Sequence, residues 1–264
     1  MNDPLWKITR GEGPLIATAV HDGHELRDEV AALTALSEQE RLREEDPYTG
    51  KWAEIANTHI VARSSRFEMD LNRPREKAIY QFPEDAWGLN LWKKPPSADI
   101  IQRSMAQYDA FYKEVKQLLE KKIARYGFFL VLDLHSYNHR REGPEGSLAD
   151  PESNPEVNVG TGTMERERWA PLVDRFITEL KTFEFLGRNL DVRENVKFRG
   201  GNFSRWIHTH FPENGCSLAV EFKKFFMNEW DGELNQEMHK TIFQALRATL
   251  PGLLEELKRL GARL

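Results

Sequence analysis

Four short apolar runs in the chain have the length and pattern of β-strands. The most apolar is FFLVLDLHS, residues 128–136, while CSLAVEFKKFF, residues 216–226, alternates apolar and polar positions with a period of two. The other two are LIATAV, residues 15–20, which stops at a His-Asp-Gly sequence, and THIVARSS, residues 58–65. Short apolar runs bounded by turn residues are typical of strands in a buried sheet.

Three longer segments carry apolar residues at the three- and four-residue spacing of amphipathic helices. The first, residues 97–127, begins with a serine that suits an N-cap and ends with a glycine. The others are residues 163–183 and 233–260, and Pro251 is expected to break or kink the last of them. Alternating strands and helices predict an α/β sandwich, in which helices cover a largely buried sheet, and we interpret residues 1–264 as a single domain.

One long segment, residues 138–162, has neither pattern and is rich in Gly, Pro, Asn and Glu. Loops of this length are usually functional or disordered. The segment follows the most apolar run directly and opens with NHRREGP, whose Arg140 and Arg141 are candidates to line or cover an acidic substrate.

Three polar residues lie where the apolar runs end. His21 and His135 follow or close two of the runs, and Glu221 lies within the fourth. Ligands of open α/β sheets bind beyond the carboxyl ends of the strands. Two histidines and a carboxylate are also the ligands of a catalytic zinc site that keeps one position open. For each histidine alone, a hydrogen-bonded structural role is the commoner explanation.

Two carboxylates near these histidines have more than one explanation. Asp133 shares a strand face with His135, so it either orients that histidine or caps nearby backbone N–H groups. Glu221 interrupts an apolar strand, where an unpaired carboxylate is costly. It therefore pairs with a cation, removes a proton from a water that a metal activates, or faces solvent on an edge strand.

Arginines in two segments are candidates to bind an anionic substrate. SRFEMDLNRP contains Arg66, Asn72 and Arg73, and a guanidinium beside an amide suits the capture of a carboxylate. The alternative is a solvated, charged loop.

The second segment, FRGGNFSRW, places Gly201 between Arg199 and Arg205 and ahead of a short helix. Backbone N–H groups can approach a ligand closely at such a position. A plain turn explains the same glycines equally well.

Composition and charge indicate which classes of partner the protein binds. The formal net charge of −5 comes from interspersed acids and bases, and the sequence shows no basic footprint for nucleic acid. No apolar run approaches the length of a membrane span, and the single cysteine, Cys216, fits a reducing compartment. These features favour a cytoplasmic protein with a small-molecule partner. The sequence also lacks a G-x-S-x-G elbow, a Walker loop and an H-E-x-x-H helix.

Taken in order, a set of motifs resembles the N-formylglutamate amidohydrolase family over about residues 15–235. The motifs are VHDG, EEDPYTGKWA, SRFEMDLNRP, LDLHSYNHRR, NVGTG, FRGGNFSR and LAVEFKKFFMNE. That family is similar to zinc carboxypeptidases and aspartoacylases. The resemblance therefore implies a three-layer α/β sandwich with a mixed central β-sheet, of the zinc-carboxypeptidase or phosphorylase/hydrolase-like type.

The same resemblance implies roles for individual residues. It implies one zinc ion held by His21, Asp46 and His135, with Glu25 as the alternative to Asp46, and Glu221 as the general base. It further implies a clamp for the substrate carboxylate. The residues of that clamp are Asn72 and Arg73. Arg66, Arg199, Gly201 and Arg205 are further candidates to bind the substrate.

These expectations describe a metal-dependent amidohydrolase of amino-acid metabolism. Its substrate is a small acidic N-acyl amino acid such as N-formyl-L-glutamate, cleaved at a linear amide bond. The alternatives are a carboxypeptidase-like or other acidic-amide deacylase, and a ligand-binding homologue without turnover.

Overall fold

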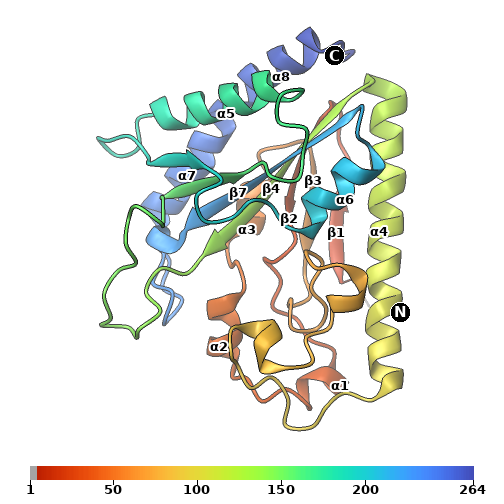
Figure 1. Cartoon of the computed structure of the whole chain (residues 1–264), viewed down its shortest axis with the longest axis vertical. Helices are drawn as coiled ribbons and strands as arrows, with labels where there is room; N and C mark the ends of the chain where they lie inside the picture. The colour runs from red at the N-terminus through yellow and green to blue at the C-terminus, as the bar shows by residue number, and fades with distance from the viewer. Residues whose placement is uncertain (1–4) are drawn as a thin grey trace.

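Seven strands form one mixed sheet in the computed structural model, which describes residues 5–264 (Figure 1). The strand order is β1-β3-β2-β4-β7-β5-β6. The strands are β1 (Trp6–Thr9), β2 (Leu15–Ala19), β3 (Thr58–Ala62), β4 (Phe129–Tyr137), β5 (Val157–Gly160), β6 (Val192–Glu194) and β7 (Gly215–Lys223). The four adjacent strands β3, β2, β4 and β7 run parallel to one another. Strand β1 is antiparallel to β3, and β5 is antiparallel to β7.

The four apolar runs of the sequence form β3, β2, β4 and β7, which are adjacent at the centre of the sheet. The strands at the two sides, β1, β5 and β6, have only three or four residues each, too few to show a period. Strand β5 lies inside residues 138–162, so the expectation that this whole segment is irregular is wrong. It forms because Val157 and Val159 are fully buried against the core while its backbone pairs with β7.

Helices begin and end close to the expected residues where capping residues mark the boundary. They are α1 (Asp28–Ala31), α2 (Glu38–Glu44), α3 (Thr49–Ala53), α4 (Ala98–Tyr126), α5 (Ala170–Thr182), α6 (Asn202–His210), α7 (Gln236–Ala248) and α8 (Leu250–Arg259), with short 3₁₀ turns η1 (Arg75–Lys77), η2 (Pro83–Ala86) and η3 (Lys224–Phe226). The hydroxyl of Ser97 caps α4 and Gly127 ends it with a positive φ. The last predicted helix divides at Thr249, with Pro251 in the first turn of α8, as expected.

The helices lie in two layers on either side of the sheet, which confirms the sandwich (Figure 1). Helices α4 and α6 pack on one face, while α3, α5, α7 and α8 pack on the other. Because side chains alternate along a strand, Leu130, Leu132 and Leu134 of β4 all join the core of the second face. Asp133 and His135 therefore project from the opposite face, on the side of α4 and α6.

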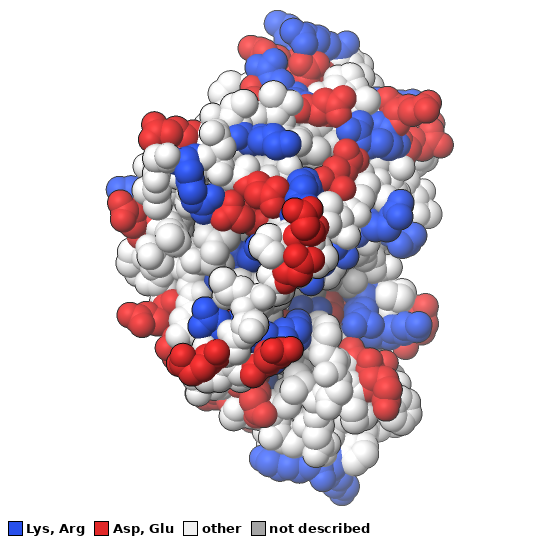
Figure 2. All heavy atoms as spheres, turned by 60° about the vertical axis from the view of Figure 1, so that its left-hand side comes forward, with Lys and Arg blue, Asp and Glu red and all other residues white. Residues whose placement is uncertain are grey.

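Two further findings bear on partners. No helix in residues 5–264 is both long enough and apolar enough to cross a membrane. Acidic and basic side chains are interspersed over the face shown in Figure 2, which agrees with the mixed charge pattern of the sequence.

Candidate active site

The two central strands place their polar residues together on one face of the sheet. His135 of β4 lies opposite Glu221 of β7 in the parallel register. Val220 and Phe222 pack into the core of the other face, so Glu221 projects to the same side as His135. Because β7 lies between β4 and β5, Glu221 is not on an edge strand, and the solvent-facing alternative is wrong.

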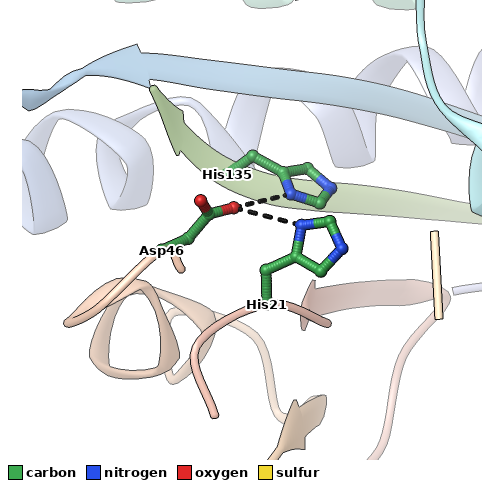
Figure 3. A group of neighbouring side chains, drawn as sticks. All are labelled: His21, Asp46 and His135. Atoms are coloured by element: carbon green, nitrogen blue, oxygen red, sulfur yellow. Dashed lines mark hydrogen bonds and ion pairs between the residues drawn. The ribbon is translucent and has the colours of Figure 1, made fainter. Parts of the chain in front are cut away.

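Asp46 brings the two histidines together from separate parts of the chain. His21 follows β2, and Asp46 follows α2 in a turn whose backbone N–H donates to the carbonyl of His21 (2.9 Å). Oδ2 of Asp46 lies 2.9 Å from Nδ1 of His135 and 3.4 Å from Nδ1 of His21 (Figure 3). All three side chains are buried, and one potential ligand atom from each lies within 4.8 Å of the others.

The other ring nitrogen of each histidine faces a second buried carboxylate. Nε2 of His21 lies 2.7 Å from Oδ1 of Asp70, and Nε2 of His135 lies 3.1 Å from Oδ2 of Asp133. The hydroxyl of Thr18 donates to the remaining oxygen of Asp133 (2.7 Å). Metal-binding histidines commonly donate their second N–H to a carboxylate in this way, which fixes the ring and directs the first nitrogen to the ion.

Hydrogen bonds and charges keep Asp46 and Asp70 ionised despite their burial. Burial opposes ionisation, but hydrogen bonds with His135 and His21 hold the pKa of Asp46 well below its usual range. The charges of His21 and Arg66 likewise hold the pKa of Asp70 well below its usual range. Burial would lower the pKa of His135, yet Asp133 and Asp46 raise it well above the ordinary value.

The donors fit a divalent metal ion of the zinc type. Two imidazole nitrogens and a carboxylate oxygen are the ligands of many catalytic zinc sites. Four buried or partly buried carboxylates also surround the two histidines, and a divalent cation would offset their charge. These carboxylates are Asp46, Asp70, Asp133 and Glu221.

Glu221 lies beside this group at the wall of a cavity of about 230 Å³. Burial raises the pKa of Glu221 to about 7, although the nearby charge of His135 lowers it. A carboxylate with a pKa near neutrality suits a general base. The cavity volume is below the roughly 300–1,000 Å³ of pockets for drug-sized ligands, so the site suits a small molecule.

Asn72 lines the cavity, and hydrogen bonds fix its position from two sides. Its Oδ1 accepts the backbone N–H of Phe203 at the start of α6 (2.9 Å), and its backbone N–H donates to Asp70 (2.7 Å). A Cβ atom on Gly201 would come within 2.3 Å of the Asn72 side chain. A glycine is therefore required at position 201 for this close approach.

Family comparison supplies an independent line of evidence. The model of the family described as N-formylglutamate amidohydrolase matches residues 13–227. The chain belongs to the N-formylglutamate amidohydrolase family. The resemblance seen in the motifs is thereby confirmed, and family membership supports a hydrolase of the amidohydrolase type acting on a small molecule.

Solved structures agree in fold with this family assignment. An N-formylglutamate amidohydrolase from Ralstonia eutropha JMP134 has a TM-score of 0.74 at 20% identity, covering 97% of this chain and 99% of that chain. A gene product from Agrobacterium tumefaciens has a TM-score of 0.69 at 16% identity, with 97% of each chain covered. No curated protein matches the chain significantly.

The remaining arginines predicted to bind substrate lie in different settings. Arg73 lines the cavity with its side chain one-third exposed, and Arg199 lines it from an exposed position. Arg66 also reaches the cavity, but its guanidinium donates to Asp70 (2.9 Å) and to the carbonyl of Glu44 (3.1 Å). It is therefore largely occupied within the protein.

Three other candidates from the sequence do not line the cavity, namely Arg205, Glu25 and Arg140. Arg205 is on the exposed side of α6, because the apolar side of that helix faces the sheet. Glu25 pairs with Arg63 at the surface (2.9 Å), so Asp46 rather than Glu25 lies beside the histidines. Of the two loop arginines, Arg141 lines the cavity, whereas Arg140 donates to the carbonyl of Pro144 (2.7 Å).

Two residues of the site were not singled out in the sequence. Asp70 precedes Asn72 by two positions in DLNR, and an acid so close to the proposed clamp was an available signal. Lys224 is the second of two adjacent lysines and gives no signal, because its burial depends on the folded chain.

Proposed function

We propose that this protein is a zinc-dependent hydrolase that cleaves the amide bond of a small acidic N-acyl amino acid, with N-formyl-L-glutamate as the reference substrate. The observation that carries the proposal is the convergence of the Nδ1 atoms of His21 and His135 on one oxygen of Asp46, beside Glu221. Family membership and the similarity to the N-formylglutamate amidohydrolase of Ralstonia eutropha support the reaction class.

His21, Asp46 and His135 would hold the ion, since they supply the three ligands and leave a position open. When bound by such ligands, zinc polarises a carbonyl oxygen and makes water a stronger nucleophile at neutral pH. Asp70 and Asp133 keep the imidazoles in the orientation that directs Nδ1 toward the ion.

Glu221 acts as the general base. Burial raises the pKa of Glu221 to about 7, which suits a carboxylate that accepts a proton from the attacking water near neutral pH. The protonated carboxyl then donates this proton to the leaving nitrogen of the amide. The products are the free acid of the acyl group and the free amino acid.

Asn72 and Arg73 bind the carboxylate of the substrate and so fix the amide relative to Glu221. Asn72 and Arg73 both line the cavity. Arg199 contributes a second positive charge, which suits a substrate with more than one carboxylate. Arg73→Ala is expected to lower kcat/KM at least about tenfold, which corresponds to about 1.4 kcal/mol.

A hydrolysis screen tests this proposal. Purified protein is assayed with zinc on N-formyl, N-acetyl and N-succinyl derivatives of glutamate, and on the N-formyl derivatives of glutamine and methionine. We expect turnover of at least one acidic N-acyl amino acid and its loss in Glu221→Gln. Absence of hydrolysis of every compound by zinc-loaded protein would favour the ligand-binding alternative and contradict the proposal.

A further inference from the structure

Lys224 is a fully buried lysine at the boundary between the cavity and β7. It is the first residue of η3, three positions after Glu221, and only 1% of its surface is exposed. Its Nζ donates to the backbone carbonyls of Arg43 (2.6 Å) and Glu45 (2.7 Å). Among the described residues its ammonium group forms no ion pair, although it lines the cavity.

Burying an ammonium group without an ion pair is costly, and packing alone does not require it. A methionine of similar length would fill the same space with an apolar side chain, and such replacements of buried charges are often neutral or stabilising. Burial lowers the pKa of Lys224 to about 8, and the charges of Asp46 and Glu44 oppose that effect. The lysine is therefore mostly protonated at neutral pH and keeps all three of its N–H donors.

The two carbonyls that Lys224 binds belong to the turn that presents Asp46. Arg43 is in the last turn of α2, and Glu45 directly precedes Asp46. On its other side this turn is held by the hydrogen bond from the Asp46 backbone N–H to the carbonyl of His21. Lys224 thus connects the segment of the proposed metal ligand Asp46 to the strand that carries Glu221.

We propose that Lys224 is a positioning residue that holds the Arg43–Glu45 backbone against the end of β7, and thereby keeps the Asp46 carboxylate in place to bind the metal ion. Functional side chains must be held within about 0.5 Å of their working geometry, and a turn without such support does not meet that demand. The inference rests on the metal site of the proposed function.

The test compares two adjacent lysines in the full-length protein. Zinc affinity is measured by chelator competition for wild type, Lys224→Met and the control Lys223→Met. The side chain of Lys223 does not line the cavity, and its charged neighbours include Glu156 and Asp191. We expect Lys224→Met to weaken zinc binding about 10- to 100-fold, as the loss of other groups that orient metal ligands does. Lys223→Met should remain within about threefold of wild type, the spread usual for context effects.

Hydrogen exchange of the metal-free proteins gives a second readout. In Lys224→Met the backbone N–H of Asp46 should exchange faster relative to the amides of β4, because only the turn loses its support. A uniform change in all amides would indicate a purely structural role. If Lys224→Met does not fold, Lys224→Gln replaces it, since glutamine is one atom too short to reach both carbonyls and should show the same losses.

The outcomes separate this inference from the proposed function. Unchanged zinc affinity in the Lys224 variant, with zinc bound by wild type, would overturn the role of Lys224 and leave the proposed function intact. Failure of wild type itself to bind zinc would overturn both.

Discussion

Buried histidines of this protein have two kinds of surroundings. His208 of α6 has neutral partners, since its Nε2 accepts the backbone N–H of Ser217 (3.0 Å) and its Nδ1 lies 3.0 Å from the hydroxyl of Thr163. His21 and His135 face a carboxylate with each ring nitrogen. All three histidines are at least nine-tenths buried, so the difference lies in the partners.

The consequence for charge is opposite in the two settings. Burial lowers the pKa of His208 to about 4, so this histidine is neutral and acts as a hydrogen-bonding link between α6 and β7. The carboxylates raise the pKa of His135 well above its ordinary value. A histidine with neutral partners, such as His208, is sufficient to link elements of a fold. The carboxylates around His21 and His135 instead concentrate negative charge, which a bound cation would offset.

Removal of a proposed ligand should have the largest effect. His135→Ala is expected to lose both zinc binding and hydrolysis, by more than the roughly 10- to 100-fold typical of groups that only orient a ligand. His208→Gln is the matched control, because it replaces a buried histidine that has no carboxylate partner. Zinc content and activity are measured for the two purified variants. Equal losses in both would show that His135 does not differ from His208 in its role.

Loss of the general base should separate activity from metal binding. Glu221→Gln keeps the size of the side chain but cannot accept a proton, so kcat should fall by about 10²- to 10⁴-fold. Zinc affinity should stay close to that of wild type, because Glu221 is outside the proposed ligand set. Steady-state kinetics with chelator competition measure both, and near-normal kcat in this variant would exclude Glu221 as the base.

The carboxylates behind the histidines should have an intermediate effect. Asp70→Asn removes the negative charge opposite Nε2 of His21 while keeping a similar shape, and zinc affinity should weaken about 10- to 100-fold. Asp109→Asn is a control, since that carboxylate pairs with Arg75 at the surface. A zinc affinity within threefold of wild type in Asp70→Asn would show that His21 is oriented without its carboxylate.

His208 should affect stability and its pH dependence, but not hydrolysis. Its pKa is about 4 in the folded state and 6.5 for the ordinary side chain, so the unfolded chain binds more protons between these values. The free energy of unfolding should therefore decrease as the pH falls from about 6.5 to 4, by up to about 3 kcal/mol from this residue. Denaturant titrations at several pH values should show a smaller decrease in the free energy of unfolding for His208→Gln than for wild type. The same pH dependence in both proteins would contradict the lowered pKa of His208.

The central strands of the sheet and the polar residues near their ends could be predicted from the sequence. Strands β4 and β7 are apolar enough to stand out, and His135 and Glu221 lie near the carboxyl ends of these strands, where ligands bind.

Residues held by tertiary contacts could not be predicted in this way. Asp46 lies in a turn after α2 without any periodic pattern, and only the family resemblance pointed to it. The functions proposed for Asp70 and Lys224 depend on contacts with His21 and with the Arg43 and Glu45 carbonyls, which are distant in sequence. Local propensity carries no information about such contacts.

The most direct test of the central claim is a zinc titration of the metal-free wild-type protein, with bound zinc and hydrolysis of N-formyl-L-glutamate and related acidic N-acyl amino acids followed together. We expect one tightly bound zinc ion per chain, with activity that rises in proportion to occupancy and disappears again with chelator. Full activity of the metal-free protein would contradict that claim.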